Sequence, residues 1–266
     1  MRINYQETAS DLQTRIDIHN QFGGRDIDKW MLDILNIQKG SKILDVGCGA
    51  GKQCFSYFKY LEGNTDITGG DVSDELLHEA KQENKRHNNA VKFIPLDFNK
   101  KFPFEDNHFD LVSCCFAIYY AKDIPFTISE IHRVLKPGGR FFSSGPMPEN
   151  KKVFYEIIHE ATHAEIPPMP GSSRYSTEIL SELENIFSGV NIEIFENPLT
   201  FKTAEPFIAY TGASLSEDRK LWKGMFTGEK DFETVMDKIS DVSEKYIKDH
   251  GNIVMTKVVG GFIATK

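Results

Sequence analysis

The sequence predicts an α/β fold with a doubly wound, mostly parallel sheet. Up to residue 146, apolar runs of strand type alternate with segments of helical periodicity, and crossover connections typically join such strands into a parallel sheet. A glycine-rich turn, Gly47-Cys48-Gly49-Ala50-Gly51, follows the first apolar run and precedes the first helical pattern. A strand, a glycine-rich turn and a helix in this order are typical of a site for a nucleotide-type ligand.

The strands and helices of this first part can be placed from their patterns. Strands are expected at 42–47, 65–71, 91–96, 109–118 and 140–144, and helices at 52–62, 73–87 and 125–135. Ser73 is a good N-cap, and acids follow it in the first turn, where they suit the helix dipole. Pro137 and the glycines after it end the helix that begins at Pro125.

The flanking segments extend this core. Helices are expected at 28–37, 150–165, 177–187 and 229–250, a loop at 166–175, and a final antiparallel pair of strands at 191–201 and 253–265. About fifty residues separate these two strands, far more than a hairpin needs. We therefore expect three parts: an N-terminal helical lid at 1–40, a core at 41–201 and 253–266, and a helical cap inserted at 202–252.

Composition and charge exclude several classes of protein. The 266 residues carry a formal net charge of −8, with 40% hydrophobic and 26% charged residues, as in an ordinary soluble domain. No basic stripe indicates nucleic-acid binding, and no run of about 20 apolar residues indicates a membrane span. The N-terminus has no apolar core of signal-peptide type, so a cytoplasmic location is expected. The four cysteines show no metal-ligand spacing, so we expect reduced thiols and no metal site.

The spacing of the glycines limits the classes of ligand that the turn could bind. It is GxGxG, which differs from the GxGxxG dinucleotide pattern, and no GKS or GKT follows. Asp71 ends the second expected strand, 20 residues after Gly51, where an α/β fold places a carboxylate against a ribose diol. The alternative for the turn alone is a tight strand-to-helix connection with no ligand.

Five motifs in order then identify a family. Asp45-Val46-Gly47-Cys48-Gly49-Ala50-Gly51 resembles motif I of the class I S-adenosylmethionine-dependent methyltransferases. The resemblance continues through Gly70–Ser73, Leu96–Phe98, Phe109–Val112 and Arg133–Gly139, and covers about residues 40–146. It is strongest to the small-molecule group that includes the ubiquinone/menaquinone-biosynthesis methyltransferases.

The resemblance implies a Rossmann-like, seven-stranded, mostly parallel sheet with the last strand antiparallel, plus the helical cap. It implies S-adenosyl-L-methionine as cofactor, with Asp71 on the ribose and Asp97-Phe98 at the adenine. An alternative for Asp97 is that it caps the turn before Asn99. The full set of expected cofactor-binding residues is Asp45, Gly47, Cys48, Gly49, Gly51, Asp71, Val72, Asp97, Phe98, Cys114 and Cys115.

Methyl transfer from a sulfonium is an in-line displacement, so alignment and exclusion of water are the main requirements. No general base is identified. Tyr119 and Tyr120 follow the fourth strand and are candidates for the acceptor pocket; further side chains considered as bases are His159, His163 and Tyr175. In the resembled family the N-terminal part folds over the cofactor, so Tyr5 or Arg25 is a candidate contact with its methionine end.

The leading hypothesis is methyl transfer to an oxygen, nitrogen or carbon of a small molecule. One alternative keeps the reaction but moves it to a protein or RNA acceptor. A second is a non-catalytic module that binds S-adenosylmethionine, and a third, an NAD-dependent oxidoreductase, is disfavoured by the glycine spacing. The oligomeric state, monomer or homodimer, stays open.

Overall fold

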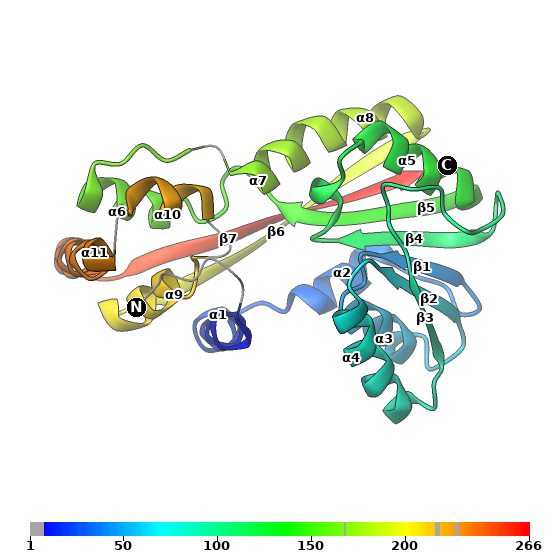
Figure 1. Cartoon of the computed structure of the whole chain (residues 1–266), viewed down its shortest axis with the longest axis horizontal. Helices are drawn as coiled ribbons and strands as arrows, with labels where there is room; N and C mark the ends of the chain where they lie inside the picture. The colour runs from blue at the N-terminus through cyan, green and yellow to red at the C-terminus, as the bar shows by residue number, and fades with distance from the viewer. Residues whose placement is uncertain (1–7, 168, 216–218, 227–228) are drawn as a thin grey trace. The chain divides into compact units, whose positions relative to one another are not determined.

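The structure, a computed structural model, describes residues 8–167, 169–215, 219–226 and 229–266. Within them, seven strands form one sheet in the order β3-β2-β1-β4-β5-β7-β6, which the labels of Figure 1 follow. The strands are β1 (Lys42–Val46), β2 (Asp66–Asp71), β3 (Val91–Pro95), β4 (Phe109–Cys115), β5 (Leu135–Pro146), β6 (Gly189–Phe201) and β7 (Ile253–Thr265).

The pairing confirms the predicted fold class. β1 is parallel to β2 on one side and to β4 on the other, with Asp45 opposite Gly69 and Ser113. β3 and β5 continue the parallel sheet outwards, and β7 pairs with β5 antiparallel. The carboxyl ends of β1, β2 and β4 therefore meet at one edge, where open α/β sheets bind ligands.

Two layers of helices cover the sheet. On one face pack α2 (Ile27–Leu35), α3 (Lys52–Tyr60) and α4 (Asp74–Asn84), and on the other α5 (Ile124–Val134) and α8 (Leu180–Ile186), as Figure 1 shows. The sequence explains this because alternate β1 residues point to opposite faces: Ile43 joins the first layer, Leu44 and Val46 the second. Both faces of the sheet are therefore covered by helices, as in a doubly wound sheet.

Some sequence-based boundaries were wrong. β4 ends at Cys115, and a short 3₁₀ turn, η2 (Ile118–Tyr120), follows where the strand was expected to run to Ile118. α5 ends at Val134 and β5 already begins at Leu135, so Pro137 and the glycines after it, which were expected to end the helix, lie inside the strand. The expected loop at 166–175 contains α7 (Pro170–Arg174), which continues through a π-helical turn, η3 (Tyr175–Ile179), into α8. A proline at the start of α7 is compatible with a helix because its missing N–H has no partner in the first turn.

The remaining helices are α1 (Ala9–Phe22), η1 (Lys85–His87), α6 (Lys152–Thr162), α9 (Ala204–Gly212), α10 (Arg219–Met225) and α11 (Glu229–His250). The bounds of α11 are those expected from its apolar periodicity. None of the helices in the described ranges is both long and apolar enough to cross a bilayer.

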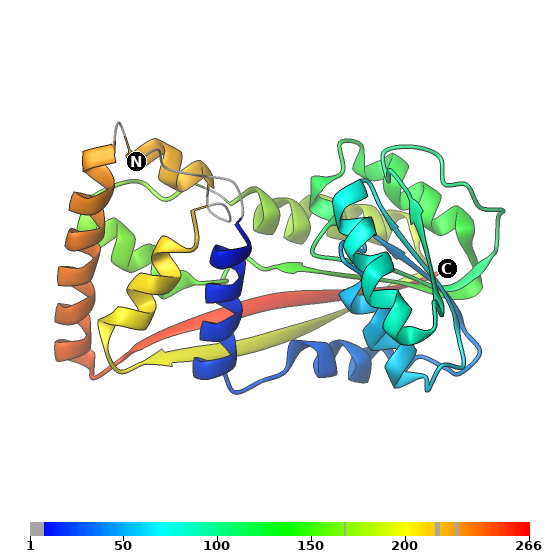
Figure 2. The same cartoon turned by 60° about the horizontal axis from the view of Figure 1, so that its bottom comes forward.

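The chain divides into two compact units. The first comprises residues 1–25, 148–169 and 196–258, and the second comprises 26–147, 170–195 and 259–266. The first unit has its own apolar core, to which Phe154, Tyr210 and Trp222 contribute, and Figure 2 shows α11 alongside α9 within it. The expected insertion at 202–252 lies in this unit, whereas α2, assigned to the lid at 1–40, lies in the second. The roles of these segments as lid and cap stay predictions.

The side chain of Tyr175 joins η3 to two strands inside the second unit. Its ring stacks on Phe262 with 4.3 Å between centroids, and its hydroxyl lies 2.8 Å from the Ser143 carbonyl and 3.2 Å from the Gly260 carbonyl. A Cβ at Gly145 would lie 2.7 Å from Tyr175 Cγ, so glycine is needed there for the ring to fit.

We expect Tyr175→Phe to lower the free energy of unfolding by about 1–2 kcal/mol, because it removes a buried donor and leaves buried acceptors behind. Urea unfolding followed by circular dichroism measures this. Tyr60→Phe is the matched control, since Tyr60 is 42% exposed. Equal stability of the two variants would contradict the structural role of the Tyr175 hydroxyl.

Candidate functional site

The glycine-rich turn is anchored to the end of β2. The N–H groups of Gly47 and Cys48 both donate to the Gly70 carbonyl, at 2.8 and 3.1 Å. The N–H of Gly49 donates to Asp71 Oδ2 at 2.8 Å. The turn and the predicted ribose-binding acid are therefore one hydrogen-bonded unit.

Each glycine in the turn has a left-handed backbone, with φ of +71° at Gly47, +54° at Gly49 and +84° at Gly51. Their surroundings differ. A Cβ at Gly47 would lie 2.7 Å from Ala117 Cβ and one at Gly51 2.8 Å from the Phe93 ring, whereas at Gly49 the nearest atom is 4.0 Å away. Gly47 and Gly51 serve close packing; Gly49 borders open space that a ligand can approach.

The carboxylate of Asp71 is held in place by two backbone donors. Gly49 donates to Oδ2, and the N–H of Ser73 donates to Oδ1 at 2.9 Å. A carboxylate has about four lone-pair sites, so each oxygen keeps capacity for a ligand hydroxyl. Val72, the next residue, is 66% exposed at the same edge.

Asp97 follows β3. Its side chain caps the turn before Asn99, which was the alternative to a contact with adenine. Its Oδ1 accepts from the backbone N–H and the side-chain amide of Asn99, both at 3.0 Å, and Oδ2 lies 3.4 Å from Lys100 Nζ. The backbone hydrogen bond from Asn99 is the main cause that lowers the pKa of Asp97. The half-buried ring of Phe98 packs near Gly47.

Asp45, the acid of motif I, is only 2% exposed. Ser113 Oγ donates to its Oδ1 at 2.6 Å, and the Cys54 thiol donates to Oδ2 at 3.5 Å. Burial raises the pKa of Asp45 to about 6, although both hydrogen bonds favour the charged form. The Asp45 carboxylate therefore lies at the base of the glycine-rich turn, hydrogen-bonded to β4 through Ser113 and to α3 through Cys54.

The cysteines of the described residues are free thiols, and Cys48, Cys54 and Cys114 are buried. Burial is the largest cause that raises the pKa of Cys114 and of Cys115 at the end of β4. Neutral thiols at these positions are packing groups and are not nucleophiles. The next residue, Phe116, has φ of +55° and is 39% exposed, a strained backbone at the strand end that the sequence did not indicate.

The candidate bases differ in their surroundings. Tyr119 and Tyr120 pack with 4.7 Å between ring centroids, and Tyr120 is 70% exposed. Tyr175 is fully buried, and its burial raises the pKa of its phenol well above the ordinary value, so this side chain is not placed to act as a base.

The other candidates lie in the first unit. His159 Nδ1 is 2.8 Å from the Ala164 carbonyl, and His163 is the C-cap of α6. Among the described side chains, no group of three or more His, Cys, Asp and Glu could hold a metal. Arg25 contacts the Glu196 carbonyl at 2.8 Å, and Tyr5 lies outside the described residues.

Sequence reasoning missed a set of buried polar atoms beside this site. Gln53 Nε2, Tyr57 OH and Ser144 Oγ are buried and have no hydrogen-bond partner among the described residues. Gln53 and Tyr57 lie one turn apart on α3, and Ser144 lies near the carboxyl end of β5. Only the helical spacing of Gln53 and Tyr57 could have been noticed in the sequence.

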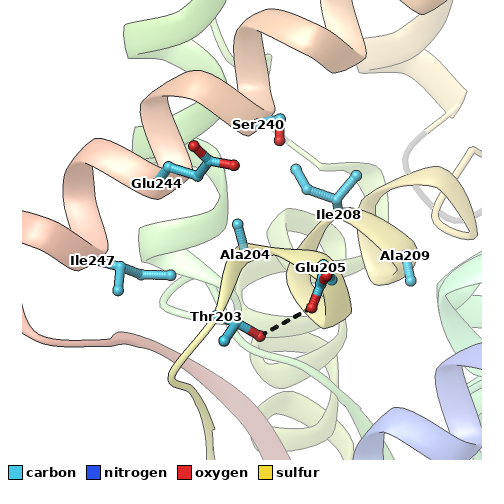
Figure 3. Close-up of a pocket in the computed structure, with 8 residues that line it drawn as sticks. All are labelled: Thr203, Ala204, Glu205, Ile208, Ala209, Ser240, Glu244 and Ile247. Atoms are coloured by element: carbon cyan, nitrogen blue, oxygen red, sulfur yellow. Dashed lines mark hydrogen bonds between the residues drawn. The ribbon is translucent and has the colours of Figure 1, made fainter.

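A hollow of about 640 Å³ lies elsewhere, within the first unit (Figure 3). It lies between the start of α9 and the second half of α11, and none of the predicted site residues lines it. Its lining consists of Thr203, Ala204, Glu205, Ile208, Ala209, Ser240, Glu244 and Ile247.

Comparison with known proteins agrees with this geometry. Residues 44–143 match a family described as a methyltransferase domain. Residues 44–143 are therefore similar to a methyltransferase domain, and the strand order and the acid at the end of β2 agree with this similarity.

The curated relatives have more specific names than the matched family. The chain is 35% identical over 111 residues to a demethylmenaquinone methyltransferase of Staphylococcus epidermidis, over 42% of this chain and 45% of that protein. It is 33% identical over 130 residues to the one of Staphylococcus haemolyticus, over 47% and 54%. The chain thus spans about half the length of these curated relatives.

Solved structures show the same fold. The YcgJ protein of Bacillus subtilis superposes with a TM-score of 0.58 at 15% identity, over 90% of this chain and 97% of that one. A putative methyltransferase of Bacillus halodurans superposes with a TM-score of 0.56 at 18% identity, over 90% and 98%.

The burial of Asp45 makes stability depend on pH. Its folded pKa of about 6 lies above the ordinary 3.8, so the contribution of Asp45 to stability is greatest below pH 4, and about 3 kcal/mol of it is lost as pH rises through 6. In Asp45→Asn this loss is absent. We expect the variant to gain about 1 kcal/mol relative to wild type between pH 5 and 7.5, measured by urea unfolding.

Asp33→Asn is the control, because Asp33 is a surface acid. A stability difference between Asp45→Asn and wild type that does not change with pH would contradict the assigned pKa.

Proposed function

We propose that this chain is an S-adenosylmethionine-dependent methyltransferase that acts on a small molecule. The observation that carries the proposal is the Asp71 carboxylate at the carboxyl end of β2, held by the N–H groups of Gly49 and Ser73. This is a ready-made acceptor pair for a ribose diol beside a turn whose central glycine borders open space.

The surrounding residues fit the cofactor. Asp71 and Val72 would contact the ribose, and Asp97 and Phe98 the adenine. The amino-acid end would lie at the glycine-rich turn and the start of α3, whose N-terminal N–H groups favour negative charge. The remaining predicted members, Asp45, Gly47, Cys48, Gly51, Cys114 and Cys115, would shape this site, Asp45 from below through Ser113.

When bound, the cofactor supplies a sulfonium methyl group that needs no acid to leave. The chain has to orient an acceptor in line with the methyl–sulfur bond and keep water away. Tyr119 and Tyr120 are the proposed acceptor-side residues, because they directly follow the end of β4 and Tyr120 is accessible. A phenol there can orient an acceptor by a hydrogen bond or, if activated, remove a proton.

A small-molecule acceptor is supported by the relatives, which are named demethylmenaquinone methyltransferases. In this chain the methyl group would pass to an oxygen, nitrogen or carbon of the acceptor. The net charge of −8 disfavours RNA, whose phosphates attract basic surfaces. The rival functions are a protein acceptor and a module that binds the cofactor without catalysis.

Calorimetric titration of the purified chain with S-adenosylhomocysteine and, separately, with NAD tests the proposal. We expect binding of the first at micromolar concentration and no binding of the second. Turnover of S-adenosylmethionine with a panel of small phenols, quinols and amines then separates an enzyme from a non-catalytic module. A folded protein that binds no S-adenosylhomocysteine would contradict the assignment.

The ribose role of Asp71 has its own test. Asp71→Asn keeps the shape but removes the charge, so we expect the Kd for S-adenosylhomocysteine to rise about tenfold or more, since charge-assisted hydrogen bonds are worth about 1.5–3 kcal/mol. Asp74→Asn, in the first turn of α4, is the matched control. If the two variants bind S-adenosylhomocysteine equally well, Asp71 does not contact the ribose.

A further inference from the structure

The hollow between α9 and α11 has the size of a small-molecule site. Its volume of about 640 Å³ lies within the range of roughly 300–1,000 Å³ that is typical of such sites. All of its lining residues belong to the first unit, and none belongs to the predicted cofactor site. Three of them are small, Ala204 and Ala209 on α9 and Ser240 on α11 (Figure 3), and larger side chains at these positions would fill the space.

One part of the lining is apolar. Ile208 of α9 and Ile247 of α11 are half-buried and pack at the edge of the apolar core of the first unit, and Ala204 is only 8% exposed. The hollow therefore has a hydrocarbon surface that water still reaches. A ligand with an apolar body would remove this surface from water, which favours binding.

The charged side chains that line the hollow are both acids. Glu205 lies in the first turn of α9 and Glu244 on α11, and within the described ranges no Lys, Arg or His lines the hollow. One oxygen of Glu205 accepts from Thr203 Oγ1 at 3.5 Å, as the dashed line in Figure 3 marks. Neither carboxylate forms an ion pair in the part of the chain that the structure describes.

The cations nearest in sequence do not neutralise these acids. Lys245, next to Glu244, pairs with Glu160 of α6, with Nζ 3.4 Å from Oε1. Lys248 follows Glu244 by four residues, the spacing of a helical ion pair, but it is exposed and the two side chains form no such pair. Lys202, just before α9, is exposed and lies outside the lining. The hollow is thus complementary to a cation.

We propose that the hollow binds a small organic cation, namely an amine with a hydrocarbon body. The ammonium group lies at Glu205 and Glu244, and the hydrocarbon body covers Ile208 and Ile247. This is a second small-molecule site. The inference does not depend on the proposed function, because none of these residues was assigned to the cofactor or to the acceptor of the methyl group.

The lining favours an amine over other classes of ligand. An anion would meet two carboxylates and no positive side chain. A bare metal ion would find too few ligands, since no group of three or more His, Cys, Asp and Glu in the described ranges could hold one, and it would leave the apolar part uncovered. A wholly apolar ligand would take water away from two carboxylates without giving them a partner, which is costly.

The test uses three probes that share a phenylethyl body: phenethylamine, 2-phenylethanol and 3-phenylpropionate. Their head groups are positive, neutral and negative. Titration of the full chain at neutral pH, followed by ligand-observed NMR, gives each Kd. We expect phenethylamine to bind about tenfold more tightly than 2-phenylethanol, because each of two exposed ion pairs contributes about threefold. We expect no binding of 3-phenylpropionate.

Glu205→Gln and Glu244→Gln each remove one charge and keep the size of the side chain. Each should raise the Kd for phenethylamine about threefold, and the double variant about tenfold, while the Kd for 2-phenylethanol stays unchanged. Glu233→Gln is the matched control, since Glu233 is an exposed acid on α11 outside the lining. Ser240→Leu tests the space itself: it should abolish binding of the amine and the alcohol in a chain that circular dichroism shows to be folded.

Several results would overturn the inference. They are equal Kd values for phenethylamine and 2-phenylethanol, tighter binding of 3-phenylpropionate, and no binding of phenethylamine at millimolar concentrations. An unchanged Kd for phenethylamine in the double variant would overturn it as well. Undiminished binding by folded Ser240→Leu would place the amine outside the hollow. None of these results bears on the proposed function, which the titration with S-adenosylhomocysteine tests separately.

Discussion

The candidate site depends on the hydrogen bonds that the Asp71 carboxylate accepts. One oxygen accepts from the N–H of Gly49 in the glycine-rich turn and the other from the N–H of Ser73, which caps α4. A single side chain thus connects the turn after β1 to the helix after β2. Because Gly47 and Cys48 also donate to the Gly70 carbonyl, the turn is held over the end of β2 before any ligand binds. A preorganised acceptor of this kind binds without spending free energy on ordering the loop.

Beneath the turn lies the buried carboxylate of Asp45, whose charged form loses the stabilisation that water would give it. Asp45 lies between Ser113 on β4 and Cys54 on α3, and its raised pKa shows that two hydrogen bonds do not fully compensate for the loss of water. Three buried polar atoms on α3 and β5 also have no hydrogen-bond partner among the described residues. Sites that bind ligands often keep such imperfectly satisfied groups, because a core optimised only for stability would replace them by apolar side chains.

Several features were predictable because they are local. Period-two and period-3.6 patterns located the strands and α11, and Ser73 caps α4 as expected. The errors occurred where contacts with residues distant in the chain decide the local structure. The proline- and glycine-rich stretch before Tyr175 was expected to be a loop, but it forms α7 because the Tyr175 ring packs on Phe262 and anchors the turn that follows. Likewise, Tyr175 was a candidate base by residue type, and only its burial shows that it is structural.

The sequence by itself determined the succession of the seven strands along the chain, the glycine-rich turn and the acid at the end of β2, since each depends on residues close together in the chain. Only the tertiary structure decided which distant side chains meet. Asp45 and Ser113 come from separate strands that the sheet places side by side, and Asp28 reaches Lys52 across two helices. Such pairs are set by packing and by desolvation, which act through space, and so no local pattern in the chain encodes them.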